Sequence, residues 1–542
     1  MISSATAKTV APEEVMGALK RYWGYDAFRP RQEKIVRSIL NLRDTCVIMP
    51  TGGGKSLCYQ LPAALLAERT AIVISPLIAL MQDQVAQLTQ MGIPSAFLNS
   101  SLNPAEQATI IKSARGGGYR LLYLSPERLA RQDTLDWLGG IPLSFFAIDE
   151  AHCISEWGHE FRPEYRQMSA LRKHFPQTPI AAFTASATRR VRHDIIEQLQ
   201  LREPDKYIAS FHRPNLHYIV KECKAPEQRA LLLKALAKYD GSTVIIYAST
   251  IKRVDQTVAM LAEEGIDALA YHGQMDADLR RTNQERWTSD EVPVLVGTNA
   301  FGLGINKAAV RAVIHLALPK SIEQYYQEAG RAGRDGQPSE CLLLWQRKDA
   351  GLLAYFAGAI EDPQEKRRAW ERYHEIIDFV ESEECRHKSI CKHFGETKTW
   401  QSCMACDVCL GTPSWFAQRI KTDRRKPQRE EPQLRAVVSE TVLPAGGFAT
   451  AIHEYLRQWR REVAKRQNTA AFIVMHDTTL EALCVKQPRT LAELRRIPGI
   501  GERKIELYGQ EILDTLSRFR DGQRAAPSVA IRKGKAAPGP GT

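Results

Sequence analysis

The sequence predicts an α/β protein with two successive parallel-sheet domains and smaller helical regions behind them. From about residue 45 to residue 345, short apolar runs rich in β-branched residues alternate with stretches of helical pattern. Continuous apolar strands that are separated by helices are typical of parallel sheets covered on both faces. The 542 residues are 44% hydrophobic and 25% charged, which is a globular composition with room for about three or four domains.

The strands are expected at apolar runs that are bounded by turn residues. The first block has such runs at residues 45–49, 71–75, 121–125 and 145–148, and the second block has them at residues 243–247, 294–297 and 312–316. Polar turn residues interrupt the pattern at residues 211–224, where the two blocks are predicted to meet. We therefore predict one α/β domain at residues 1–210 and a second at residues 211–350.

The C-terminal part of the chain is predicted to contain helical modules and linkers. Residues 351–384 carry apolar residues at helical spacing, so a helix is expected there that leads into a cysteine cluster and completes a module at residues 351–411. Residues 412–447 are polar and basic and predict a linker. A helical domain is expected at residues 448–520, and the Ala-, Gly-, Pro- and Lys-rich residues 521–542 predict a disordered basic tail.

The positive charge is concentrated near the C-terminus. Residues 411–542 hold 24 Lys and Arg against 14 Asp and Glu, which accounts for most of the net charge of +12. This local excess favours a polyanionic partner, with a merely solubilising tail as the alternative. No apolar stretch reaches the ~18 residues of a membrane helix, and residues 1–14 lack the apolar core of a signal peptide. We expect a cytoplasmic protein, nucleoid-associated if it is bacterial, with no membrane partner.

A glycine-rich turn between a strand and a helix predicts a phosphate-binding loop. Residues 49–56 read Met-Pro-Thr-Gly-Gly-Gly-Lys-Ser, with Met at the position where the strict pattern has Gly. Backbone N–H groups of such a turn wrap phosphates, Lys55 can reach the terminal phosphates, and Ser56 can hold Mg²⁺. The predicted nucleotide-binding residues are Thr51, Gly52, Gly53, Gly54, Lys55 and Ser56.

An acidic pair follows the apolar run at residues 145–148. Asp149 is placed at a strand end to bind Mg²⁺ through water, and Glu150 can orient or deprotonate the attacking water. A glycine loop or an acidic strand end alone is weak evidence. The two motifs together predict hydrolysis of ATP with Mg²⁺.

The cysteine spacing predicts a metal site. Cys385 is followed by Cys403, Cys406 and Cys409, and four thiolates at such spacing suit one tetrahedral Zn²⁺. Three nearby side chains are rival first ligands: Cys391, His387 and His393. The remaining cysteines have apolar sequence neighbours and are expected to be small core residues.

The ordered motifs resemble those of superfamily 2 helicases. The phosphate-binding loop, the Asp-Glu-Ala-His box, residues 184–188 (TASAT) and residues 327–335 (QEAGRAGRD) carry this resemblance. Residues 28–32 (FRPRQ) and 153–165 (CISEWGHEFRPEY) are similar to the RecQ DNA helicases in particular. The resemblance implies two RecA-like lobes, a structural zinc module and an all-α HRDC-like domain. It also implies an ATP-dependent 3′–5′ helicase that translocates on single-stranded DNA and unwinds duplex or branched DNA in recombination, repair and replication.

The resemblance also implies roles for individual residues. Tyr25 should stack on adenine, while Arg29 and Gln32 read its edge. Arg334 is expected to act as the arginine finger and Arg331 as its γ-phosphate partner, where surface ion pairs are the bland alternative.

An aromatic-rich segment follows the acidic box. Trp157, Phe161 and Arg162, together with His159, are expected to contact single-stranded DNA, since aromatic and guanidinium groups stack on bases. Glu160 stands where the family usually has Asp. The alternative is a loop that packs into the core.

The C-terminal region departs from the family pattern. Residues 497–504 predict a helix–glycine turn–helix whose N–H groups could meet a phosphate, although Phe472 replaces a usual Tyr and leaves DNA binding uncertain. Residues 411–447 are too few for the winged-helix domain that is usual at this place. Single-strand-binding or other recombination proteins are possible partners. A translocase or annealing factor that unwinds poorly and an architectural DNA-binding protein remain rival functions, and an RNA helicase is less favoured.

Overall fold

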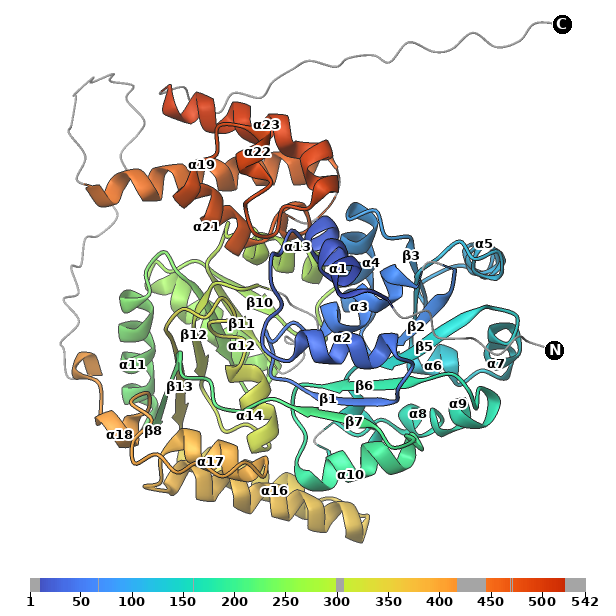
Figure 1. The fold of residues 1–542 in the computed structure, drawn as a ribbon. Coiled ribbons are helices and arrows are strands. Elements are labelled where there is room, and N and C mark those ends of the chain that lie inside the picture. Colours follow the sequence, from blue (N-terminus) through green and yellow to red (C-terminus); the bar gives the residue numbers. More distant parts are fainter. Residues whose placement is uncertain are drawn as a thin grey trace, which may run out of the picture.

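The computed structural model describes residues 10–66, 68–158, 160–298, 307–416, 445–467, 469 and 471–521. Within these residues, two parallel sheets with flanking helices form lobe 1 and lobe 2, which lie side by side (Figure 1). Several predicted features lie outside the described residues: His159, most of the segment 297–307, the linker after residue 416, and the tail. The expected lack of a winged helix falls in that linker.

Lobe 1 is built on a seven-stranded sheet in the order β3-β4-β2-β5-β6-β1-β7, in which neighbouring strands run parallel. The central strands β1, β2 and β4 are buried along their whole length, because helices cover both faces. The strands are β1 (Thr45–Ile48), β2 (Thr70–Ile74), β3 (Ser95–Leu98), β4 (Leu121–Leu124), β5 (Leu143–Ile148), β6 (Ile180–Thr184) and β7 (Asp205–Ile208).

The helices of lobe 1 connect successive strands across the sheet. Their bounds are α1 (Pro12–Ala18), a π-helical turn (Leu19–Trp23), α2 (Gln32–Leu40), α3 (Lys55–Leu65), α4 (Ile78–Gln90), α5 (Pro104–Arg115), α6 (Pro126–Leu129), α7 (Gln132–Leu138), a 3₁₀ turn (Ala151–Ile154), α8 (Pro163–Arg166), α9 (Ser169–His174) and α10 (Arg189–Gln198).

Lobe 2 is built on a six-stranded parallel sheet in the order β10-β11-β9-β12-β13-β8. Its elements are β8 (Leu216–Glu222), α11 (Ala225–Lys238), β9 (Thr243–Tyr247), α12 (Ile251–Glu263), β10 (Ala268–Tyr271), α13 (Ala277–Thr288), β11 (Val294–Gly297), β12 (Val310–His315), α14 (Ile322–Ala329) and β13 (Ser339–Trp345). The predicted polar break at residues 211–224 is therefore wrong in part, because it contains β8. β8 lies at the sheet edge, where it mixes buried, half-buried and exposed residues and lacks a continuous apolar run.

The zinc-binding module extends the far edge of lobe 2. Its helices are α15 (Arg347–Gly358), α16 (Pro363–Glu381), α17 (Arg386–His393) and α18 (Asp407–Leu410), followed by a 3₁₀ turn (Ser414–Phe416). The single helix predicted for residues 351–384 is wrong, because the chain breaks before Pro363 and two helices form that pack against each other. The backbone N–H of Tyr218 in β8 donates to the carbonyl of Ala405 at 3.2 Å, which fixes the module to the sheet edge.

The C-terminal bundle lies at the opposite end of the molecule from the zinc-binding module (Figure 1). It comprises α19 (Ala445–Arg466), α20 (Ala471–Val474), α21 (Asp477–Lys486), α22 (Leu491–Leu494) and α23 (Glu502–Arg520), as the helical pattern predicted. It has an apolar core of its own, to which Leu456, Leu483 and Leu516 contribute. In the part of the chain that the structure describes, no helix is long and apolar enough to cross a membrane.

Candidate active site and metal centre

A cavity of about 360 Å³ lies between the two lobes at the carboxyl ends of their central strands. Lobe 1 contributes Lys55, Asp149 and Glu150 to its wall, and lobe 2 contributes Arg331 and Arg334. In parallel α/β sheets this edge is where ligands bind, because the loops after successive strands converge there.

The glycine turn between β1 and α3 has the conformation of a phosphate-binding loop. Gly52 and Gly54 have φ angles of +82° and +81°, which other residues rarely adopt. The ammonium of Lys55, at the first position of α3, donates to the carbonyl of Met49 at 3.2 Å. Burial lowers the pKa of Lys55, although Glu150 and Asp149 oppose that shift. The turn therefore presents a buried ammonium beside the N-terminus of a helix, which suits a phosphate chain.

The residues predicted to read adenine lie against this turn. Arg29 donates through its guanidinium to the carbonyl of Gly52, and the Gln32 amide donates to the carbonyls of Gly53 and Gly54 at 3.3 and 3.2 Å. Tyr25 lines the same cavity, and burial raises the pKa of its hydroxyl. Arg29 and Gln32 thus hold the loop in shape, and Tyr25 offers an aromatic face to the cavity.

The acidic pair stands at the end of β5, as expected. Burial and the neighbouring Glu150 raise the pKa of Asp149 to about 7, because two carboxylates so close disfavour a second negative charge. Glu150 has a left-handed φ of +48°, which is uncommon outside glycine and turns its side chain towards His152. The Glu150 backbone is strained, and the two carboxylates repel each other. A cation such as Mg²⁺ would relieve that repulsion, so the site is suited to bind one.

The acidic pair is linked to the TASAT segment by His152. Its Nδ1 lies 3.2 Å from Glu150 and 2.9 Å from the Thr184 hydroxyl at the end of β6. Ser186, two residues later, accepts a hydrogen bond at 2.9 Å from Gln327 of lobe 2. These contacts form a polar connection from the Glu150 carboxylate to the opposite lobe.

Arg334 reaches the glycine turn from lobe 2. A Cβ on Gly52 would lie 3.2 Å from the Cγ of Arg334. Burial, together with Arg331 and Arg213, lowers the pKa of Arg334 to about 9. Guanidinium groups clustered in this way repel one another, so this side of the cavity is complementary to phosphate.

Arg213 is a site residue that sequence reasoning missed. Its guanidinium donates to the carbonyl of Thr51 in the glycine turn at 3.2 Å and to the carbonyl of Gly333 in lobe 2 at 3.0 Å. It therefore joins the two lobes beside the cavity. Its partners are backbone carbonyls, which leave no mark in a sequence motif.

The aromatic loop, residues 153–165, lies apart from the nucleotide cavity. Trp157 is partly buried, with the guanidinium of Arg190 2.9 Å and that of Arg368 5.3 Å from its ring centre. Phe161 and Arg162 are also partly buried. The loop is thus neither fully exposed nor packed into the core, and arginines cover part of its aromatic surface.

A second cavity of about 650 Å³ begins at this loop. Glu160 lines one side, and the ends of β9 and β12 and helices α15 and α16 line the others. Phe356, 56% exposed, stands at its rim. Polar strand ends and aromatic groups together suit an extended polymer with flat bases.

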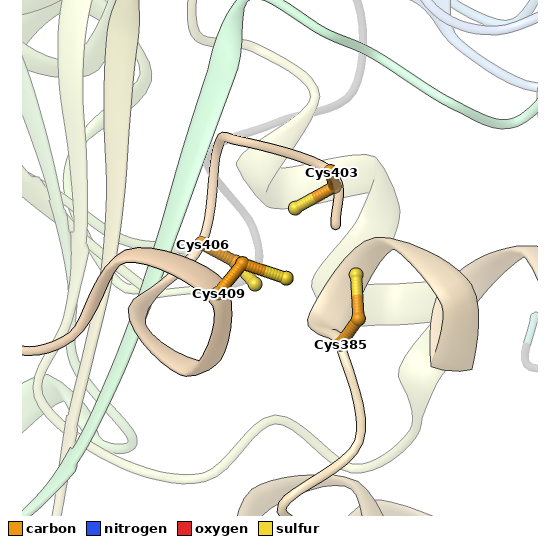
Figure 2. Close-up of side chains that lie close together, drawn as sticks. All are labelled: Cys385, Cys403, Cys406 and Cys409. Atoms are coloured by element: carbon orange, nitrogen blue, oxygen red, sulfur yellow. The ribbon is translucent and has the colours of Figure 1, made fainter. Parts of the chain in front are cut away.

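The four predicted zinc ligands converge (Figure 2). The sulfur atoms of Cys385, Cys403, Cys406 and Cys409 all lie within 4.8 Å of one another. Thiolates bound tetrahedrally at roughly 2.3 Å from one ion are separated by similar distances, so the donor set fits Zn²⁺. Bound zinc supplies structural cross-linking here, since four protein ligands leave no open position for chemistry.

The rival ligands have other partners. The Nε2 of His387 lies 3.0 Å from the carbonyl of Leu216, and His393 pairs with Glu323 at 2.8 Å. Cys391 is buried beside Phe394 and Glu396. The other cysteines predicted to be core residues are buried, except Cys484, which is half-exposed.

Models of known families match most of the chain. Residues 29–195 match the DEAD/DEAH box helicase family and residues 227–336 the helicase conserved C-terminal domain. Residues 347–410 match the RecQ zinc-binding domain and residues 449–516 the HRDC domain.

Curated relatives share about a third of the residues over almost the whole chain. The ATP-dependent DNA helicase RecQ of Pasteurella multocida is 34% identical over 94% of this chain and 94% of its own length. The ATP-dependent DNA helicase RecQ of Bacillus subtilis is 33% identical over 92% of this chain and 98% of its own length. The first alignment spans 602 positions, more than the 542 residues present here, so that relative carries segments that this chain lacks.

Solved structures show the same two-lobed fold at lower sequence identity. The DEAD-box helicase Mss116 bound to single-stranded RNA and UDP-BeF superposes with a TM-score of 0.53 at 16% identity. The match covers 68% of this chain and 83% of that protein.

Proposed function

Because this chain belongs to the RecQ family and is an ATP-dependent DNA helicase, we propose that ATP is hydrolysed in the cavity between its lobes. One observation carries the proposal: Lys55 and Glu150 of lobe 1 and Arg334 of lobe 2 line a single cavity. A nucleotide there contacts both lobes, so its hydrolysis changes how firmly they are held together.

The phosphate chain is held by both lobes. The N–H groups of residues 51–55 and the Lys55 ammonium bind the phosphates, while Ser56 and Asp149 would hold Mg²⁺. Bound Mg²⁺ supplies charge neutralisation on the phosphate oxygens. Glu150 orients the attacking water and accepts its proton. Arg334, with Arg331 beside it, stabilises the charge that develops on the transferring phosphoryl group.

The base is held at the other end of the cavity. Tyr25 stacks on adenine, and Gln32 offers both a donor and an acceptor to its edge. Arg29 and Gln32 also donate to carbonyls of the glycine turn. These contacts connect the base end of the cavity with the turn that holds the phosphates.

Single-stranded DNA is proposed to run from the aromatic loop across the second cavity. Trp157, Phe161 and Arg162 lie at one end of this path, and Phe356 lies at its rim. Glu150 is separated from Trp157 by only seven positions and is linked to lobe 2 through His152. A strand that moves the loop can therefore act on the catalytic carboxylate.

The cycle gives directed movement. ATP closes the lobes on the strand and hydrolysis reopens them, so that the protein translocates along the strand.

We propose 3′–5′ polarity and roles in recombination, repair and replication, as is typical of the family. The substrates are single-stranded and branched DNA, single-strand-binding protein is a candidate partner, and the cytoplasm is the proposed location. The domain boundaries are proposed as at residues 210, 350, 411, 447 and 520.

The direct test is a strand-displacement assay with forked, 3′-tailed, 5′-tailed and four-way DNA. We expect ATP-dependent unwinding of substrates with a 3′ single strand and none of those with only a 5′ strand. Single-strand-stimulated hydrolysis without displacement of any substrate would instead identify a translocase. The absence of DNA-stimulated hydrolysis would contradict the motor itself.

A further inference from the structure

The C-terminal bundle is docked on lobe 1 by close backbone contact. The N–H of Gly499, in the turn between α22 and α23, donates to the carbonyl of Gly24 at 3.4 Å. A Cβ on Gly24 would lie 2.6 Å from the backbone of Ile500, and a Cβ on Gly501 would lie 2.5 Å from the carbonyl of Arg21. No larger residue fits on either side, so this glycine turn is shaped to the motor rather than open to a phosphate.

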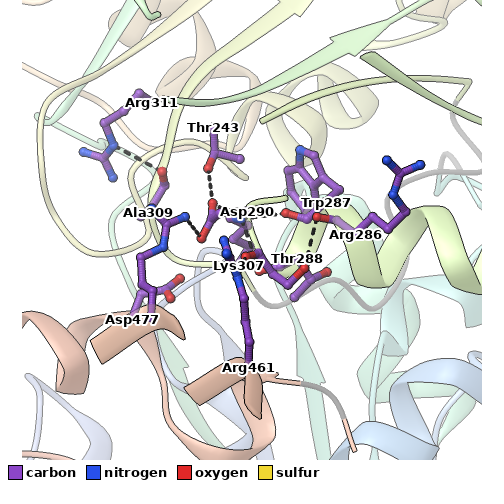
Figure 3. A network of polar contacts seen from close by, with 12 residues as sticks. Thr243, Arg286, Trp287, Thr288, Asp290, Lys307, Ala309, Arg311, Arg461 and Asp477 are labelled. Carbon is purple, nitrogen blue, oxygen red and sulfur yellow. Dashed lines mark hydrogen bonds and ion pairs between the residues drawn. The ribbon is translucent and has the colours of Figure 1, made fainter. Parts of the chain in front are cut away.

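The same bundle is bonded to lobe 2. Asp290, just beyond α13, is held by Thr243 at 2.9 Å and by the buried ammonium of Lys307, both from lobe 2 (Figure 3). Arg457 of α19 forms an ion pair with the other oxygen of Asp290. From the same helix, Arg461 donates to the carbonyl of Ser289 at 2.8 Å.

The charges on Asp290 make this contact strong. Burial alone would raise the pKa of its carboxyl, but the cations of Lys307 and Arg457 hold it at about 2. A buried carboxylate that loses one of two cationic partners is left partly uncompensated, so Arg457 and the docked position of the bundle depend on each other.

Between these two contacts, the bundle covers the nucleotide cavity. His476 and Thr478, at the start of α21, line the same cavity as Tyr25 and Lys55. Their position is fixed from inside the bundle, because the buried Arg460 donates to the Met475 carbonyl at 2.8 Å and to Asp477 at 2.7 Å. His476 is thus held rigidly between two bonded neighbours.

We propose that the C-terminal bundle forms a third wall of the nucleotide site, in which His476 and Thr478 contact the nucleoside part of bound ATP. The bundle meets lobe 1 at Gly24, which directly precedes Tyr25. That places it at the base end of the cavity. Burial lowers the pKa of His476 to about 4, so its ring is neutral at pH 7. A neutral ring and a hydroxyl suit sugar and base groups, whereas the phosphates already face Lys55 and the arginines.

Docking and nucleotide affinity must then be coupled. A ligand that contacts the docked bundle stabilises docking, and by thermodynamic reciprocity a docked bundle raises affinity for that ligand. The inference rests on the proposed function, because it takes the cavity between the lobes as the ATP site.

The test measures binding of a non-hydrolysable ATP analogue with Mg²⁺ to the full chain by calorimetry. We expect His476→Ala with Thr478→Ala, and separately Arg457→Ala, to raise the dissociation constant by roughly fivefold or more. Lys465→Ala, which removes an exposed charge from the same helix as Arg457, should leave it unchanged. Inorganic triphosphate, which lacks the nucleoside, should bind the His476/Thr478 variant as it binds the unsubstituted chain.

A second measurement needs no substitution. Hydrogen exchange at the Gly499 amide and along α19 should slow when the ATP analogue is added, because the analogue stabilises docking. If the analogue binds through Lys55 but neither the exchange rates nor the affinities of the variants change, the third wall is refuted. If the unsubstituted chain and Lys55→Ala bind the analogue equally, the proposed ATP site is itself at fault.

Discussion

The guanidinium carbon of Arg190 lies 2.9 Å from the centre of the Trp157 ring. Arg190 belongs to α10, which begins directly after the TASAT segment, and Trp157 belongs to the aromatic loop. Arg368 of the zinc-binding module also lies over this ring and pairs with Glu156 at 3.2 Å. The tryptophan therefore connects lobe 1 with the zinc-binding module, and a base that stacks on it must compete with a guanidinium group.

Replacement of Trp157 by alanine should separate DNA sensing from hydrolysis. Basal ATP hydrolysis should persist, since Trp157 does not line the nucleotide cavity. Stimulation by single-stranded DNA should fall by roughly tenfold or more, as the loss of a stacking base contact of about 1–3 kcal/mol implies. Steady-state hydrolysis with and without oligonucleotide measures both. Normal stimulation would mean that Trp157 serves packing alone.

The proposed catalytic residues Lys55 and Glu150 should separate into binding and chemical roles. Lys55→Ala should abolish hydrolysis and weaken nucleotide binding, because it removes a buried cation from the phosphate site. Glu150→Gln should lower hydrolysis by about a hundredfold or more while it preserves binding, since the amide retains the shape but not the base. Calorimetry and a phosphate-release assay distinguish the two, and Lys112→Ala on the exposed surface of α5 is the control. Turnover of either variant at the unsubstituted rate would remove these residues from the mechanism.

The strands that bear the motifs could be predicted from the sequence, and several edge elements could not. β1 and β5 are buried along nearly their whole length and appear as continuous apolar runs, so the glycine turn and the acidic pair were placed correctly at their ends. β7 alternates half-buried and exposed residues, and β8 mixes buried, half-buried and exposed ones, so both resemble polar loops in the sequence.

The docking of the C-terminal bundle had no sequence signal. It depends on glycines such as Gly24 and Gly499, whose contribution is the absence of a side chain. Lys307 is buried and forms an ion pair with Asp290, although a lysine in a polar segment is usually exposed. A charged residue in a motif predicts either a ligand contact or an internal ion pair, and only the tertiary structure distinguishes them.

The zinc ligands can be distinguished by metal content. The unsubstituted chain should carry one Zn²⁺, and Cys385→Ser should lose it along with thermal stability, because structural zinc contributes directly to folding. Cys391→Ser should retain the metal, since Cys391 is not in the four-sulfur cluster. Elemental analysis of both purified proteins tests this. Zinc lost from the Cys391 variant but kept by the Cys385 variant would reverse the assignment.

Lys504 is buried in the C-terminal bundle at a cost in stability. Lys504 is 5% exposed, and its ammonium has one long contact, 3.4 Å to the carbonyl of Gly499. Burial lowers the pKa of Lys504 to about 8. Because the unfolded chain holds this proton up to about pH 10.5, stability should rise with pH between about 8 and 10.5. Lys504→Met should remove that rise and stabilise the bundle by of the order of 3 kcal/mol at pH 7, as measured by calorimetric melting. Melting of Lys504→Met at an unchanged temperature would show that the ammonium is solvated.

The basic surface of the C-terminal bundle should contact the DNA duplex. The glycine turn and Lys504 face the motor or the interior, whereas the neighbouring Arg495 and Arg496 are exposed and can meet a phosphate backbone. Each phosphate contact steepens the salt dependence of binding by about one counterion. Arg495→Ala with Arg496→Ala should therefore weaken forked-DNA binding and reduce the slope of log affinity against log salt by about two. Single-strand-stimulated hydrolysis should be preserved, because neither residue lines the nucleotide cavity.

Anisotropy titrations at several salt concentrations measure the slope, and a truncation after Gly411 provides the comparison. If the truncation loses fork affinity and the double variant does not, the duplex contact lies elsewhere in residues 412–542. If neither loses it, the C-terminal charge does not serve DNA binding.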